Sequence, residues 1–157
     1  MISIKNILVP SDFSDASSIA LRYGKEFATT FGATLHVAHV VEEVVLDYYA
    51  WTSGGMAPAL SGVRADMEQS SNLMLDKLLT PEEQAACHAK LITLTGSPFV
   101  EIVRYARTND IDLIVIGTHG RGAIAHMLLG SVAERVVRKA PCPVLTVRPE
   151  EHEFVMP

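Results

Sequence analysis

The residues with the clearest chemical potential are a set of spaced glycines near the C-terminal end of the chain. They form the pattern Gly117-x2-Gly120-x9-Gly130-Ser131, which follows an apolar, β-branched run at residues 113–116. Glycine lets the main chain approach a phosphate without interference from a Cβ atom, and N–H groups at the start of a helix attract anions. The spacing therefore predicts a phosphate site at this strand–helix junction.

The same glycines also allow a structural interpretation. Glycines at such junctions are often only turn residues, and Ser131 with Glu134 three residues later has the pattern of a helix capping box. Asp12 has two interpretations as well: it is a ligand group at a strand end, or a helix-entry residue that competes with Ser14 as the cap. The positions at strand ends favour ligand binding in both cases.

Histidine and arginine residues carry less information. His119 either donates to a phosphate or is a solvated loop side chain, and Arg121 either supplies charge to a terminal phosphate or has no function. His36 and His39 are expected on opposite faces of one strand because side chains alternate along it. These two residues therefore cannot form a chelating pair by themselves.

Five apolar, β-branched runs alternate with longer stretches of helical spacing, which is typical of βαβ units. The expected strands are residues 4–9, 35–41, 90–94, 113–116 and 144–147. Right-handed crossovers predict an open parallel sheet with helices on both faces, which is an α/β fold. We expect a single doubly wound, Rossmann-like sheet of five strands in the order 3-2-1-4-5. Ligands of such sheets bind beyond the carboxyl ends of the strands, where the glycines and Asp12 lie.

Helices are expected between these strands. The predicted helices run from Ser14 to Gly32, from residue 63 to residue 86, from Pro98 to Asn109, and from Ser131 to Lys139. Thr80 followed by Pro81 resembles a restart within the second helix. The first helix has an apolar stripe at helical spacing, consisting of Ala16, Ile19, Ala20, Tyr23, Phe27 and Phe31.

Residues 46–62 fit neither the helix nor the strand period, and they are long for a connection. We interpret them as a mobile lid or a disordered insertion. The aromatic side chains of Tyr48, Tyr49 and Trp51 either close over an adenine ring or pack locally, and we favour local packing.

Composition limits the class of protein. With 157 residues, 48% of them hydrophobic, the chain has the size and core of a single domain, residues 1–157. The net charge of -5 argues against non-specific binding to nucleic acid or to an acidic membrane. The sequence shows no long apolar run or secretory leader, and Cys87 and Cys142 lack a metal-type spacing. A cytoplasmic protein without a metal site is expected.

Two familiar nucleotide motifs do not fit the sequence. The turn after the first strand lacks the glycines of a dinucleotide-binding fold, and the chain has no Walker loop. The chain instead resembles the universal stress protein family over essentially its full length. The resemblance is carried by residues 7–14, 36–40 and 96–98 and by the glycine pattern, which is similar to that of the family's ATP-binding branch.

The resemblance implies that the ligand is ATP or another adenine nucleotide, with or without Mg²⁺. In the family pattern, Asp12 would contact the ribose or adenine, and the backbone of Val40 would read the adenine edge. The residues implied around the ribose and phosphates are Gly117, His119, Gly120, Gly130, Ser131 and Val132. Pro10, at the end of the first strand, and Arg121 complete the expected set.

The expected site offers binding groups but no recognisable general base, whereas phosphoryl transfer needs a positioned metal and a group that orients the nucleophile. We therefore expect an ATP-binding sensor or regulator of the stress response, read by an unidentified protein partner. One alternative is a slow Mg²⁺-dependent adenine-nucleotide hydrolase. The other is a nucleotide-independent dimeric interaction module.

The two last segments of the chain suggest how copies associate. In the predicted sheet order, the strand Val144–Val147 is an exposed apolar edge, which favours antiparallel pairing with a second copy. The family resemblance implies the same homodimer. Residues 149–157, which include three glutamates, are expected to form a frayed tail.

Overall fold

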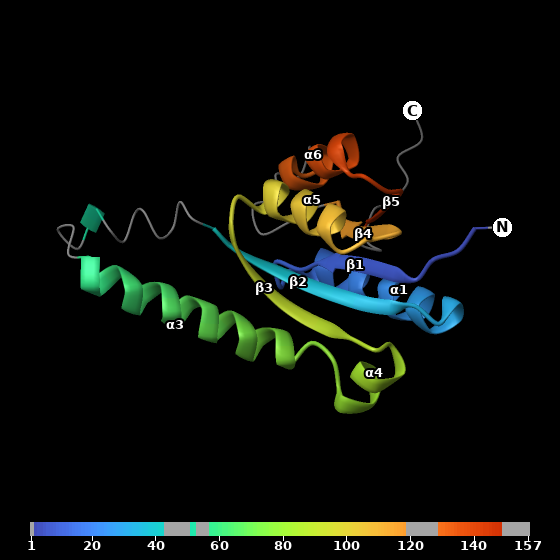
Figure 1. Ribbon diagram of the computed structural model, residues 1–157, viewed down its shortest axis with the longest axis horizontal. Coiled ribbons are helices and arrows are strands. Elements are labelled where there is room, and N and C mark those ends of the chain that lie inside the picture. Colours follow the sequence, from blue (N-terminus) through green and yellow to red (C-terminus); the bar gives the residue numbers. More distant parts are fainter. Residues whose placement is uncertain (1, 43–50, 53–56, 119–128, 149–157) are drawn as a thin grey trace.

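The computed structural model describes residues 2–42, 51–52, 57–118 and 129–148, and for residues 57–61 it describes the backbone. In these residues five parallel strands form one sheet in the order β3-β2-β1-β4-β5 (Figure 1). The strands are β1 (Asn6–Pro10), β2 (Thr34–Glu42), β3 (Lys90–Gly96), β4 (Leu113–Gly117) and β5 (Val144–Val147). The predicted α/β class and strand order are confirmed.

The helices cover both faces of this sheet. They are α1 (Asp15–Phe31), α3 (Ala57–Asp76), α4 (Pro81–Ala86), α5 (Pro98–Thr108) and α6 (Ser131–Lys139). One apolar core joins the sheet to α1 and α3 and to the residues on either side of α4, Leu79 and Cys87, and a second core joins it to α5 and α6. In Figure 1, α5 and α6 lie together on one side of the sheet, and α3 lies on the other.

The two cores are separated by the alternation of side chains along the central strands. In β1, Ile7 and Val9 belong to the core under α1, whereas Leu8 belongs to the core under α5 and α6. All three side chains are fully buried. This explains the continuous apolar run in β1, because a strand that is covered on both faces has no solvent-facing side chain.

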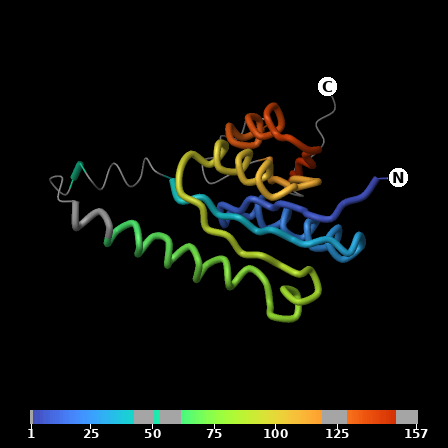
Figure 2. The backbone as a smooth tube through the Cα atoms, viewed as in Figure 1, coloured from blue at the N-terminus to red at the C-terminus, as the bar shows by residue number. Residues whose placement is uncertain are grey.

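The centre of the sheet joins segments that are far apart in the sequence. Ile7 of β1 is paired with Leu113 of β4, and Leu8 is paired with Ile114. Figure 2 shows the blue β1 beside the orange β4. On its other side β1 pairs with β2, where Pro10 is the partner of Ala38.

The apolar stripe predicted for α1 is partly wrong. The buried positions of this helix are Ala16, Ser17, Ala20, Leu21, Gly24 and Ala28. Tyr23 and Phe31 are 45% and 48% exposed. The reason is close packing: a Cβ atom at Gly24 would lie 2.4 Å from Cγ2 of Val9, so small side chains face the sheet and the aromatic ones lie beside them.

The predicted helix at residues 63–86 is two helices. α3 begins earlier, at Ala57, and ends at Asp76, and α4 starts after Thr80. The restart is confirmed, because the Thr80 hydroxyl accepts from the Glu83 amide while the Glu83 carboxylate accepts from the Thr80 amide, a capping box. Residues 57–62 of the expected insertion 46–62 therefore belong to α3.

Of the expected aromatic residues in that insertion, Trp51 is the one within the described residues. Its side chain is 83% exposed, so local packing is the wrong interpretation for this residue. Tyr48 and Tyr49 lie outside the described residues. Among the helices that the structure describes, none has the length and apolar character needed to cross a lipid bilayer.

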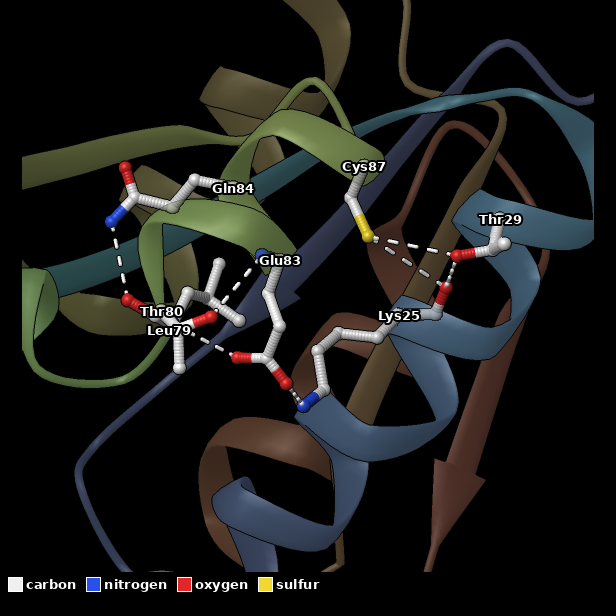
Figure 3. Close-up of polar contacts among 7 residues, drawn as sticks. All are labelled: Lys25, Thr29, Leu79, Thr80, Glu83, Gln84 and Cys87. Atoms are coloured by element: carbon white, nitrogen blue, oxygen red, sulfur yellow. Dashed lines mark hydrogen bonds and ion pairs between the residues drawn. The ribbon is translucent and has the colours of Figure 1, made fainter.

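An ion pair fixes α4 to α1 (Figure 3). Nζ of Lys25 lies 2.6 Å from Oε1 of Glu83, and the second carboxylate oxygen of Glu83 accepts from the Thr80 amide at 2.9 Å. The hydrogen bonds from Lys25 and Thr80 lower the pKa of Glu83. Beside them, the buried thiol of Cys87 contacts Thr29 and the Lys25 carbonyl. These contacts hold the turn that leads into β3.

Candidate functional site

The candidate site lies where the winding of the sheet reverses. The chain passes from β1 to β2 and β3 on one side, and then crosses to β4 and β5 on the other, so β1 and β4 flank the switch point. Their last residues are Pro10 and Gly117. In open α/β sheets, ligands bind in the crevice outside the strand ends at this position.

The start of α6 is attached to the end of β4. The amide of Gly130 donates to the carbonyl of Thr118 at 2.5 Å, and the amide of Thr118 donates to the carbonyl of Val147 at 2.9 Å. The predicted residues Gly117, Gly130 and Ser131 are therefore brought together. Val132, the next residue of α6, is half-buried and packs against the core under α5 and α6.

The capping box predicted at Ser131 is wrong. Gly130 is the N-cap of α6, with extended backbone angles, and Ser131 is the first helical residue. From that position the Ser131 hydroxyl does not serve as the cap, and the Glu134 carboxylate instead pairs with Arg138 at 2.9 Å. The Ser131 side chain is exposed at the positive end of the helix dipole, where an anion is favoured.

Gly117 has a packing role that does not depend on a ligand. A Cβ atom at this residue would lie 2.8 Å from the carbonyl oxygen of Ala16, in the first turn of α1. Real Cβ atoms essentially never come so close to an oxygen atom of the main chain. Gly117 thus allows α1 to pack directly on the end of β4, so the structural interpretation applies to this glycine.

Asp12 lies in the turn between β1 and α1. One carboxylate oxygen, Oδ1, accepts from the amide of Ser14 at 3.1 Å and from its hydroxyl at 2.5 Å. Ser14 is the N-cap of α1, since its side chain accepts from the Ser17 amide, as predicted. Asp12 therefore supports the cap and does not replace it. This contact also fixes the carboxylate beside the end of β1.

Three residues to which the sequence analysis assigned no role, Ser11, Phe13 and His39, shape the same turn. Phe13 has a positive φ of 63°, and its ring lies 4.4 Å from the ring of His39, centroid to centroid. Nδ1 of His39 lies 2.8 Å from the carbonyl oxygen of Ser11. Because a carbonyl oxygen only accepts, Nδ1 carries the hydrogen. β2 thus holds the turn that carries Asp12.

Val40 has its side chain in the core and its backbone near the crevice. The side chain is 9% exposed and belongs to the core under α5 and α6. Backbone groups alternate between the two neighbours of a strand, and the carbonyl of Ala38 accepts from Ser11 on the β1 side. The backbone groups of Val40, two residues later, face the same side, beyond Pro10 at the end of β1.

The edge of the site near β3 contains a buried acid. Gly96 has a φ of 144°, and a Cβ atom there would lie 2.8 Å from Oε1 of Glu101. Glu101 is 6% exposed and pairs with Arg104. The sequence motif at residues 96–98 did not indicate this contact, which lies five residues along the chain in the first turn of α5.

The remaining predicted residues, His119, Gly120 and Arg121, lie outside the described residues. In the part of the chain that is described, no group of three or more His, Cys, Asp or Glu side chains is arranged to hold a metal ion. The site as described therefore consists of one fixed carboxylate, a strand backbone and the start of a helix.

Known proteins resemble this chain in sequence and in architecture. The family model described as universal stress protein family matches residues 3–148. The chain belongs to the universal stress protein family. Universal stress protein MJ0577 of Methanocaldococcus jannaschii is 31% identical over 158 residues, which cover 92% of this chain and 94% of that protein.

Solved structures of universal stress proteins share the fold. The structure of MJ0577 has a TM-score of 0.79 and 27% identity, and covers 96% of this chain and 100% of that one. A universal stress protein solved in complex with cAMP has a TM-score of 0.64 and 24% identity, with 94% of this chain and 98% of that one covered. One from Archaeoglobus fulgidus, in complex with dAMP, has a TM-score of 0.59 and 22% identity, with coverage of 93% and 98%.

Proposed function

We propose that this universal stress protein binds an adenine nucleotide, ATP foremost, and acts as a nucleotide-dependent regulator in the stress response. The observation that carries the proposal is the convergence of three elements at the switch point. These are the turn after β1 with Asp12, the end of β4 at Gly117, and the start of α6 at Gly130. Dinucleotide and mononucleotide ligands of parallel sheets bind at such a position.

Each element supplies a different kind of contact in this proposal. The amides at the start of α6 and the Ser131 hydroxyl bind phosphate oxygens, because they lie at the positive end of the helix dipole. The Asp12 carboxylate accepts from the ribose hydroxyls, and the Val40 backbone contacts the adenine edge. His119, Gly120 and Arg121 complete the phosphate contacts from the connection between β4 and α6.

The family supports the choice of nucleotide. Two structural relatives were solved with cAMP and with dAMP, so this fold accommodates an adenine nucleoside phosphate. The net charge of this chain is -5, which repels an anion from the molecule as a whole. A phosphate is therefore bound only where the groups that bind it are concentrated at one place. The first turn of α6 is such a place.

Thermal unfolding of nucleotide-free protein tests the proposal. A ligand that binds only the native state adds about 2.7 kcal/mol of stability at a hundred times its Kd. For a chain of this length we expect the Tm to rise by about 5 to 10 °C with ATP·Mg²⁺, ADP, AMP or cyclic AMP, and to stay unchanged with GTP. Absence of a shift with every adenine nucleotide at saturation would favour the nucleotide-independent dimer, and fast ATP turnover would favour the hydrolase.

The variant Gly130→Leu tests the position of the site. Gly130 has extended backbone angles that other residues adopt, so we expect the variant to fold and to lose the nucleotide-induced Tm shift because leucine fills the phosphate position. Gly62→Leu is the matched control, since Gly62 is exposed in α3 and a Cβ atom there meets no atom within 4 Å. Equal Tm shifts in the two variants would place the nucleotide elsewhere.

We also propose that two copies pair through β5, which lies at an edge of the sheet. The carbonyl of Pro143 accepts from the amide of Ile114 in β4, and the carbonyl of Val147 accepts from the amide of Thr118, the residue after β4. Because backbone groups alternate along a strand, those of Val144 and Thr146 point away from β4. They are placed to bond to the β5 strand of a second copy.

Thr146→Pro removes one outward amide and leaves the bonds to β4 intact, because proline is tolerated in an edge strand where its nitrogen faces outward. We expect this variant to be a monomer in analytical ultracentrifugation at concentrations where the parent chain is a dimer. Thr146→Val, which keeps the amide, is expected to remain a dimer. A dimer in both variants would exclude pairing through this edge.

A further inference from the structure

Ser11, the residue that follows β1, is held by β2 at both of its main-chain groups. Its amide donates to the carbonyl of Ala38 at 2.8 Å, and its carbonyl accepts from Nδ1 of His39, also at 2.8 Å. The first bond continues the pairing of the two strands, whereas the second is made by a side chain. Two consecutive residues of β2 therefore fix the residue that precedes Asp12.

The residue that follows Asp12 is held by the same histidine. The ring of Phe13 lies 4.4 Å from the ring of His39, centroid to centroid, and the Phe13 amide donates to Oγ of Ser11 at 3.2 Å. Phe13 has a φ of 63°, a left-handed conformation that costs free energy for a bulky residue and persists only where its surroundings hold it. His39 thus contacts both residues that flank Asp12 and supports the strained one.

The Asp12 carboxylate is therefore positioned from two sides. On the α1 side, its Oδ1 accepts from the amide and the hydroxyl of Ser14. On the β2 side, His39 fixes the peptides before and after Asp12, so rotation of either one would turn the carboxylate. A binding group must be held within about 0.5 Å and about 10 to 20° of its productive position, which requires support of this kind.

We propose that His39 is a positioning residue of the nucleotide site, which holds the turn after β1 so that the Asp12 carboxylate faces the ribose hydroxyls. This inference rests on the proposed function. His39 acts without touching the nucleotide and without a charge, since the neutral ring with its hydrogen on Nδ1 makes both contacts. The histidine therefore determines how much the ribose hydroxyls, as distinct from the base and the phosphates, contribute to binding.

Nucleotides with and without ribose hydroxyls separate this role from a purely structural one. We expect the parent chain to bind ATP·Mg²⁺ at least about tenfold more tightly than dideoxy-ATP·Mg²⁺ in isothermal titration calorimetry, because a hydrogen bond to a charged group contributes that much. His39→Leu removes the donor but keeps an apolar side chain against Phe13. We expect this variant to bind dideoxy-ATP as the parent chain does and to prefer ATP by about twofold or less.

Two matched variants test whether the hydrogen bond of His39 is responsible. His39→Asn places an amide donor near the position of Nδ1, and we expect it to retain most of the preference for ATP. Val37→Ala removes fully buried apolar atoms two residues earlier on the same face of β2, so we expect it to lower the Tm and to keep the parent's preference. Loss of the preference in either variant would contradict the positioning role of Nδ1.

A double-mutant cycle connects the effect to the carboxylate. In an Asp12→Ala background, His39→Leu is expected to cause no further change in the ratio of the two affinities, and a further change would overturn the proposal. ATP binding by the parent chain with equal affinity for dideoxy-ATP, or with an unchanged ratio in His39→Leu, would overturn this inference alone. Absence of ATP binding by the parent chain would overturn the proposed function with it.

Discussion

Replacing Gly117 with alanine is expected to lower the free energy of unfolding of the nucleotide-free protein by about 2 to 3 kcal/mol, because an added methyl group in a tightly packed site forces the backbone to move. The new Cβ would lie 2.8 Å from the carbonyl oxygen of Ala16 and 2.9 Å from its carbonyl carbon. Main-chain atoms in the first turn of a helix cannot rotate away as a side chain can. The whole start of α1 must shift, which also disturbs the turn that carries Asp12.

Urea denaturation of Gly117→Ala measures this loss, with Gly62→Ala as the control. Gly62 is exposed in α3 with open space around its Cα, so alanine there is expected to raise stability by up to about 1 kcal/mol through helix propensity. The same replacement of glycine by alanine is therefore expected to lower the free energy of unfolding at position 117 and to raise it at position 62. If Gly117→Ala were as stable as the parent chain, the close contact between α1 and β4 would be disproved.

Lowering the pH from about 7 to about 5 is expected to cost roughly 2 kcal/mol of stability through a single side chain, His36. His36 is 1% exposed, and its Nδ1 lies 2.9 Å from the hydroxyl of Tyr105. Its Nε2 has no hydrogen-bond partner among the residues that the structure describes. Burial, and secondly the charge of Lys90, lowers the pKa of His36 from 6.5 to about 4. The structure thus favours the neutral ring.

The direction of this pH effect follows from the number of protons that His36 binds in the unfolded and folded states. Between the two pKa values the unfolded chain binds a proton at His36 and the folded chain does not, so acid favours unfolding. The loss of stability from His36 grows as the pH falls below about 6.5 and is complete only below the folded pKa of about 4. The window from about pH 7 to about pH 5 lies above the ordinary pKa values of carboxyl groups, about 4, so it lies above the usual range of acid denaturation.

His36→Gln supplies the comparison, because glutamine can bond to the Tyr105 hydroxyl but does not titrate. We expect the stability of the variant, measured by urea denaturation at several pH values, to change by about 2 kcal/mol less between pH 7 and pH 5 than that of the parent chain. Parallel stability curves for the two proteins would show that His36 is protonated equally in the folded and unfolded states.

Much of the fold could be predicted because its signals are local. Apolar, β-branched runs separated by helical spacing predict a parallel sheet once right-handed crossovers are applied, with helices on both faces. The expected order 3-2-1-4-5 follows the common doubly wound pattern. The cap at Ser14 and the restart at Thr80 are also local patterns, and both are confirmed. The α1 stripe is wrong because Gly24 packs against Val9, a contact between elements that hydrophobic spacing does not encode.

The candidate site shows the same limit. The glycine pattern correctly indicates that the end of β4 and the start of α6 meet, as the bond from Gly130 to Thr118 shows. The pattern Ser131-x-x-Glu134 indicates a helix start but not which residue is the N-cap. In the structure the N-cap is Gly130, one residue earlier. The close contact of Gly117 with Ala16 joins residues a hundred positions apart, so no local pattern could reveal it.

The central position of β1 has a consequence for biosynthesis. β1 is made first, yet its partner β4 is made about 100 residues later, which corresponds to roughly 5 to 20 s of translation. Throughout that interval one edge of the nascent sheet has no strand to pair with, although β2 and β3 are already available on the other side. Asp112, the residue before β4, joins this late segment to the start of β1. Its carboxylate accepts from the amides of Lys5 and Asn6 at 2.7 and 2.9 Å. Until its second half emerges, the nascent chain therefore carries an unpaired strand edge at the centre of its future sheet, the kind of edge that promotes pairing with other chains.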